Sequence, residues 1–95
     1  MEYSDLFANA RFEAPEGILT AQIKNQRAAE PDRVELLLWF YDQAGKPVEA
    51  NLTVVVSQPA LENDANGEYG RRVLDTVQRW LTSVRDGEPR QILEQ

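Results

Sequence analysis

The segment 62–67 is the part of the chain that comes closest to a known chemical motif. It reads Glu-Asn-Asp-Ala-Asn-Gly, which places side-chain oxygens at alternate positions and glycine at the sixth, as in a calcium-binding loop. The match fails at the twelfth position, because Val73 stands where calcium needs a bidentate glutamate. We therefore interpret the segment as a polar loop in which Asp64 or Asn66 accepts hydrogen bonds from the first amides of a helix. No metal site is predicted.

Catalytic residue types are scarce in this chain of 95 residues, which has no histidine and no cysteine. These absences exclude imidazole acid–base catalysis, thiolate nucleophiles and zinc sites built from Cys or His ligands. The hydroxyl groups of Ser57 and Ser83 have no imidazole to activate them, and no glycine-rich phosphate loop is present. The 16 carboxylates are scattered rather than paired. We predict a non-enzymatic protein with no catalytic residue and no cofactor.

Charge is unevenly distributed along the chain. The formal net charge is −6, with 12 acidic and 5 basic side chains in residues 1–70 and 4 acidic and 5 basic in residues 71–95. An acidic chain is repelled by phosphate backbones and anionic lipid surfaces, so we expect no direct nucleic-acid partner and no membrane partner. The plainer interpretation of the charged groups is ordinary solvated surface. The residues that would form a charged docking surface are Glu13, Glu16, Glu30 and Asp32, together with Arg71, Arg79 and Arg85.

The segment 33–57 is the most informative, since it holds two β-branched and aromatic runs around a turn-forming stretch at 42–47. Burial favours the hairpin register that makes one face wholly apolar. The facing pairs are then Val34 and Val56, Leu36 and Val54, Leu38 and Leu52, and Phe40 and Ala50. The opposite face carries Leu37, Trp39, Tyr41 and Val55 among polar residues.

That second face is too apolar to be left in water, so another surface should cover it. Tryptophan and tyrosine are typical anchors of protein interfaces, and we predict these four residues as an interface. The alternative cover is the N-terminal turn of the same chain, which contains Leu6 and Phe7.

Periodicity and turn signals predict a single domain over residues 1–95, of the α+β class. We expect a mainly antiparallel four-stranded sheet covered on one face by a long C-terminal helix. The expected elements are strands at about 10–14, 18–26, 33–42 and 48–57, a helix at about 67–86, and a short flexible tail at 88–95. The helix should end at Gly87 and Pro89.

Two function classes stay open for this chain. The first is a protein-interaction or assembly protein that associates through the aromatic face, in its simplest form as a homodimer. The second is a small acidic inhibitor of the phage or mobile-element type, which mimics nucleic-acid charge and binds a basic nucleic-acid-processing protein. No signal peptide and no apolar run of membrane-spanning length is visible, so we expect a cytoplasmic protein.

Overall fold

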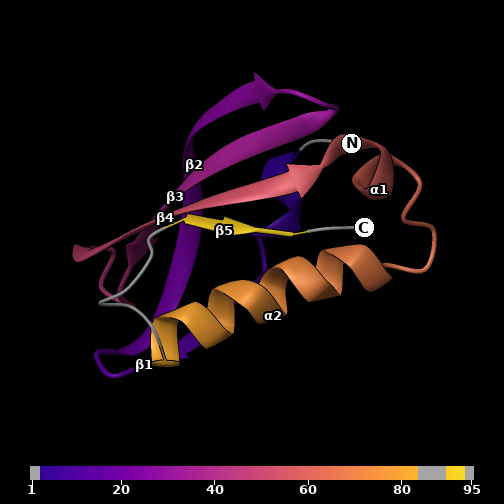
Figure 1. Cartoon of the computed structure of the whole chain (residues 1–95). Helices are drawn as coiled ribbons and strands as arrows, with labels where there is room; N and C mark the ends of the chain where they lie inside the picture. Colours follow the sequence, from indigo (N-terminus) through magenta and orange to yellow (C-terminus); the bar gives the residue numbers. More distant parts are fainter. Residues whose placement is uncertain (1–2, 84–89, 94–95) are drawn as a thin grey trace.

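The computed structural model describes residues 3–83 and 90–93 of the chain. In chain order the elements are the 3₁₀ turn η1 (Tyr3–Leu6), strands β1 (Phe12–Ala14), β2 (Gly17–Ala29), β3 (Arg33–Tyr41) and β4 (Pro47–Ser57), helices α1 (Gln58–Glu62) and α2 (Glu68–Ser83), and strand β5 (Arg90–Ile92). Figure 1 shows α2 lying across one side of a curled sheet. The class is therefore α+β, as predicted.

The sheet has five strands in the order β1-β2-β3-β4-β5, and it is mixed rather than purely antiparallel. The first four strands pair antiparallel with their neighbours, whereas β5 runs parallel to β4. The prediction of a four-stranded sheet with a C-terminal helix is thus wrong in two respects, because a fifth strand exists and follows α2. A strand of three residues is too short to show an alternating pattern in the sequence.

Strand β5 occupies part of the segment that was predicted to be a flexible tail. The Leu93 side chain is buried, and its backbone N–H donates to the Val55 carbonyl at 2.9 Å. The buried Tyr69 hydroxyl donates to the Leu93 carbonyl at 3.1 Å and accepts from the Ser57 N–H at 2.8 Å. The tail prediction is therefore wrong for residues 90–93, while the predicted helix end at 84–86 and its stop at Gly87 and Pro89 lie outside the described residues.

The hairpin register predicted from burial is confirmed over most of its length. Val34 pairs with Val56, Leu36 with Val54, and Leu38 with Leu52. Past Trp39 the register shifts, and Tyr41 pairs with Pro47. Phe40 and Ala50 are both buried despite this irregularity.

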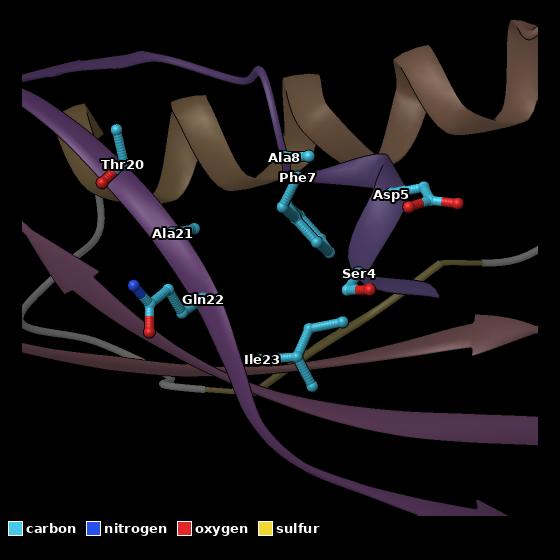
Figure 2. A pocket seen from close by; sticks show the side chains of 8 residues that line it. All are labelled: Ser4, Asp5, Phe7, Ala8, Thr20, Ala21, Gln22 and Ile23. Atoms are coloured by element: carbon cyan, nitrogen blue, oxygen red, sulfur yellow. The ribbon is translucent and has the colours of Figure 1, made fainter. Parts of the chain in front are cut away.

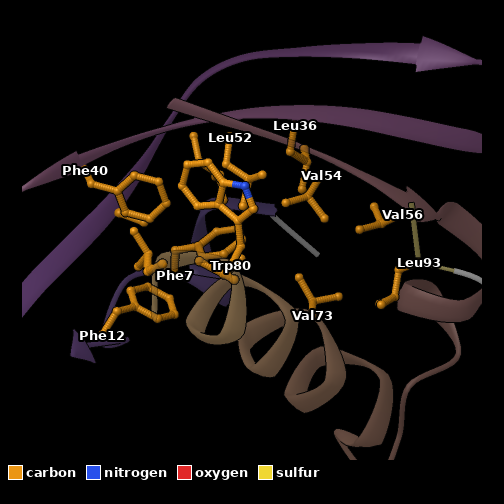
Figure 3. Packing of buried hydrophobic residues seen from close by; sticks show 14 of the residues in the cluster. Phe7, Phe12, Leu36, Phe40, Leu52, Val54, Val56, Val73, Trp80 and Leu93 are labelled. Carbon is orange, nitrogen blue, oxygen red and sulfur yellow. The ribbon is translucent and has the colours of Figure 1, made fainter. Parts of the chain in front are cut away.

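The core lies between α2 and the wholly apolar hairpin face (Figure 3). The ring of Phe40 stacks on Trp80 at a centroid distance of 6.2 Å and meets Phe12 edge-on at the same distance. Phe7 is buried in the same cluster, 3% exposed. The helix therefore covers the aliphatic face, and the N-terminal turn adds to that core instead of covering the aromatic face.

Strand β1 is attached to α2 by a side-chain amide. Gln78 Oε1 accepts from the Glu13 N–H at 2.9 Å, and Gln78 Nε2 donates to the Glu13 carbonyl at 2.7 Å. The amide thus bonds β1 through both a donor and an acceptor, as a neighbouring strand would.

Candidate functional site

The sheet face turned away from α2 is the candidate site, and we call it the open face. Its members follow from the strand pairing, since residues opposite each other in adjacent strands point to the same side. They are Thr20, Gln22, Asn25 and Arg27 of β2, Glu35, Leu37, Trp39 and Tyr41 of β3, Asn51, Thr53 and Val55 of β4, and Arg90 and Ile92 of β5.

All four residues predicted as an interface lie on the open face, but they differ in accessibility. Trp39 is 40% exposed, Leu37 and Tyr41 are half-buried, and Val55 is only 5% exposed. Val55 is flanked on one side by β5, where Ile92 pairs with it. Ile92 itself is 58% exposed, so it replaces Val55 as an accessible apolar member.

A β-bulge in β2 brings a cation to the open face. Ile23 pairs with Leu38 and Asn25 with Leu37, so Lys24 is an extra residue between two ladder positions. Lys24 Nζ lies 5.4 Å from the Trp39 ring centroid and 5.5 Å from that of Tyr41, within cation–π range of both. Bulges commonly redirect a side chain in this way. Lys24 was not among the predicted site residues, although the loss of apolar alternation after Ile23 signals the bulge.

Three charged side chains from three strands meet farther along the open face, beyond Leu37. Arg90 Nη2 donates to Glu35 Oε2 at 3.2 Å, and Arg27 Nη2 lies 3.6 Å from Glu35 Oε1. The hydrogen bond from Arg90, assisted by the positive charges of Arg90 and Arg27, holds the pKa of Glu35 below its usual value, although desolvation acts in the opposite direction. No local pattern in the sequence predicts this triad, because its members lie on three different strands and Arg90 is 55 residues from Glu35 along the chain.

Two hollows flank Trp39 on the open face. One, of about 170 Å³, is lined by Asn25, Arg27, Glu35, Leu37 and Thr53. The other, of about 530 Å³, is lined by Arg11, Ile18, Thr20, Gln22, Tyr41, Asp42, Gln43 and Gly45. Because Gln22 pairs with Trp39 and Leu37 lies two residues before it on the same face, the tryptophan forms a ridge between the hollows.

A third hollow of about 500 Å³ lies between η1 and β2 (Figure 2). Its lining residues are Ser4, Asp5, Phe7, Ala8, Thr20, Ala21, Gln22 and Ile23. Asp5 is the one titratable side chain in that lining, so no acid–base pair converges there.

The structure does not bring the predicted charged docking residues together. Glu13 in β1 and Glu16 in the following turn lie at one end of β2, whereas Glu30 and Asp32 lie at its other end. Arg71 and Arg79 are exposed on α2, where Arg79 pairs with Asp75 at 3.3 Å. Arg85 lies outside the described residues.

The loop at 62–67 caps α2, as the sequence analysis interpreted it. Asp64 Oδ1 accepts from the Tyr69 N–H at 3.0 Å, and Oδ2 accepts from the Gly70 N–H at 2.8 Å. These hydrogen bonds, with that of the Glu68 amide and the nearby charge of Arg71, hold the pKa of Asp64 below its usual value against desolvation. Both carboxylate oxygens are thus engaged by the helix.

No protein-family model, curated protein or solved structure matches the chain, so the site is interpreted from its own geometry. In residues 3–83 and 90–93, no helix combines the length and the apolar composition that crossing a bilayer requires.

Proposed function

We propose that this protein is a non-enzymatic interaction protein that docks another protein on its open face. The observation that carries the proposal is the 40% exposure of Trp39 at the middle of an ordered sheet. Trp39 and Ile92 are the two large hydrophobic residues classed as exposed in the part of the chain that the structure describes, and both lie on this face. Tryptophan is among the residues that most often dominate binding energy in protein interfaces.

The charged groups of the site favour binding over catalysis. Glu35 is hydrogen-bonded to a guanidinium and its pKa lies below the usual range, which makes the carboxylate a weaker base. Acid–base catalysis near neutral pH generally needs a carboxylate whose pKa is raised. Glu35 therefore serves better to orient Arg27 and Arg90 than to move a proton.

The acidic-inhibitor alternative has no comparable support. It needs Glu13 and Glu16 on one continuous surface with Glu30 and Asp32, and these pairs lie at opposite ends of the 13-residue strand β2. The partner in this proposal is a second copy of the chain, paired about a two-fold axis, or a different protein, and the experiment below distinguishes the two.

Site-specific photo-crosslinking tests the proposal in cells of the organism that encodes the protein. A benzophenone amino acid is placed at Asn51, which is exposed and pairs with Trp39, so that the tryptophan itself stays intact. We expect a discrete protein adduct on illumination, and its mass distinguishes a second copy from a different partner. The matched control carries the same group at the exposed Arg79 of α2.

Loss of that adduct in a Trp39→Ala background, with circular dichroism showing an unchanged fold, supports docking on the open face. The proposal fails if the adduct persists at equal yield in this background, or if the Arg79 position captures the same species equally well.

A further inference from the structure

We propose that the open face binds an acidic segment of a different protein, an inference that rests on the docking function proposed above. Between Lys24 and β5 the described residues of the face include three cations, Lys24, Arg27 and Arg90, and one carboxylate, that of Glu35. The chain as a whole has a net charge of −6. The exposed tryptophan therefore stands in a locally positive region of an acidic molecule.

The cations of this region retain capacity for a partner. The Arg27 side chain is 73% exposed and approaches Glu35 with one nitrogen at 3.6 Å, while Arg90 is 47% exposed. Each guanidinium has five N–H donors, and Nη2 of each lies near Glu35. Within residues 3–83 and 90–93 no carboxylate lies within ion-pair distance of Lys24, whose ammonium group rests over aromatic rings.

Two acidic side chains lie on the other side of Trp39, toward the β3–β4 turn. They are Asp42 and Glu49. Asp42 Oδ1 already accepts from the Ala44 and Lys46 amides, both at 2.9 Å, and holds the turn. Neither carboxylate lies on the side of Trp39 toward Arg27 and β5, where the described side chains carry more positive than negative charge.

This charge pattern disfavours a second copy as the occupant. A two-fold axis that passes close to the cations would set Lys24, Arg27 and Arg90 of one copy against the same cations of the other. If the open face of one copy bound the acidic surface of another, the contact would be head-to-tail. Head-to-tail contacts form a closed ring only when the rotation between neighbouring copies divides a full turn, and otherwise they form an open filament.

Single-stranded nucleic acid fits less well than a peptide. It carries a phosphate at every nucleotide, and charges beyond the small positive region would meet the repulsion of an acidic protein. A peptide segment with a few carboxylates places its charge only where the cations are.

The hollow of about 170 Å³ indicates how the open face would recognise the acidic segment of the partner. Its lining combines the apolar Leu37 with the charged Arg27 and Glu35. An apolar side chain of the partner would enter beside Trp39, and flanking carboxylates would reach Lys24 and Arg27. The expected recognition element is therefore an apolar or aromatic residue with Asp or Glu on both sides.

Peptide display tests the inference with a defined probe. The full chain selects from a random library of peptides about 12 residues long, displayed on phage and counter-selected against the Trp39→Ala variant. Enriched peptides are synthesised, and their affinity is measured by fluorescence anisotropy at about 50 mM and about 200 mM salt. We expect acidic peptides whose affinity falls by about tenfold over this range.

The decisive variant is Lys24→Glu with Arg27→Glu, and its control is Arg71→Glu with Arg79→Glu on α2, which changes the net charge equally. The first should weaken binding by more than about tenfold, and the second by less than about twofold. Enrichment of neutral or basic peptides that still depend on Trp39 overturns the acidic partner but leaves the docking function standing. If selection yields no peptide whose binding depends on Trp39, both the acidic-partner proposal and the docking function fail.

Two further probes separate the competing occupants. If a labelled 15-nucleotide oligo-dT binds more tightly than the selected peptides and loses binding in Lys24→Glu with Arg27→Glu, the face belongs to single-stranded nucleic acid, and the proposal is wrong. If sedimentation shows a dimer that Trp39→Ala converts to a monomer of unchanged fold, the occupant is a second copy, and the proposal is likewise wrong.

Discussion

At the residue scale, two buried or half-buried oxygen-bearing side chains hold the segments that follow β4. Tyr69 at the start of α2 bonds the end of β4 and the residue after β5 through one hydroxyl. Asp64 bonds the first turn of α2 through both carboxylate oxygens. Each side chain bonds backbone groups of another segment, which is why a single substitution at either position has a predictable cost.

Tyr69→Phe should destabilise the protein by about 1–3 kcal/mol. The substitution keeps the ring but leaves the Ser57 N–H and the Leu93 carbonyl without their partner in a buried site. Urea denaturation measures the change. Tyr41→Phe is the matched control, because Tyr41 lies half-buried on the open face. This variant should lose much less folding stability than Tyr69→Phe. Equal losses in the two variants would contradict a structural role for the Tyr69 hydroxyl.

The carboxylate of Asp64 makes stability depend on pH. Its pKa in the folded chain lies below the usual value, so its contribution is complete above the pKa of the unfolded chain, about 3.9. As pH falls through the folded pKa, that contribution is lost. We expect Asp64→Asn to melt below the wild type at pH 7, with the difference narrowing below about pH 4.

Thermal melts across this pH range, with Glu49→Gln as an exposed carboxylate control, check the Asp64 prediction. The pKa of Glu35 is also lowered, so protonation of Glu35 should add to the loss of wild-type stability as the pH falls. A constant difference between wild type and Asp64→Asn at every pH would mean that the capping charge is unimportant.

At the element scale, the bulge in β2 determines what the open face displays. Because Ile23 pairs with Leu38 and Asn25 with Leu37, Lys24 is the one residue between them without a ladder partner. A regular strand has a side-chain period of two, and an inserted residue resets which side chains point to which face. The bulge therefore keeps Leu19 and Ala21 in the core while Arg27 points to the open face.

Deleting Lys24 should preserve the fold, whereas deleting Gln22 should disrupt it. The first deletion joins Ile23 to Asn25 and leaves a regular ladder opposite Leu38 and Leu37. The second shifts the preceding half of β2 by one residue and turns Leu19 and Ala21 away from the core. Circular dichroism and urea denaturation compare the two variants. A cooperative transition for both, or for neither, would contradict the bulge assignment.

At the scale of the whole molecule, the sheet separates two tryptophans that have different roles. Trp80 of α2 is 2% exposed and stacks on Phe40 inside the core, while Trp39 is 40% exposed on the other side. One helix of this length covers a single sheet face, so a domain of 95 residues has little left to cover the second.

Trp80→Ala should cost about 3–5 kcal/mol of folding stability, as large core truncations do. Trp39→Ala should cost about 1 kcal/mol, since much of its ring already faces solvent. Urea denaturation with matched m-values measures both changes. Comparable losses would assign Trp39 to the fold rather than to binding.

Much of the fold was predictable because it depends on local or period-two patterns. The hairpin register followed from requiring one wholly apolar face, and the helix cap followed from an Asp placed just before an apolar stripe. The expected strands correspond to β1–β4, although β2 extends to Ala29 and β1 begins at Phe12. Strand β5 was missed because three residues carry no period.

The sequence by itself determined which hairpin residues are buried, where α2 begins and which aromatic residues share a face, since each of these is set by neighbours close along the chain or by a strict alternation. Only the tertiary structure decided that β5 lies beside β4 and that Glu35 meets both Arg27 and Arg90. The same holds for Lys24, which reaches Trp39 and Tyr41 across the β2–β3 pairing. These contacts join residues far apart in sequence, and the free energy that favours them arises only once the core has set the strands side by side.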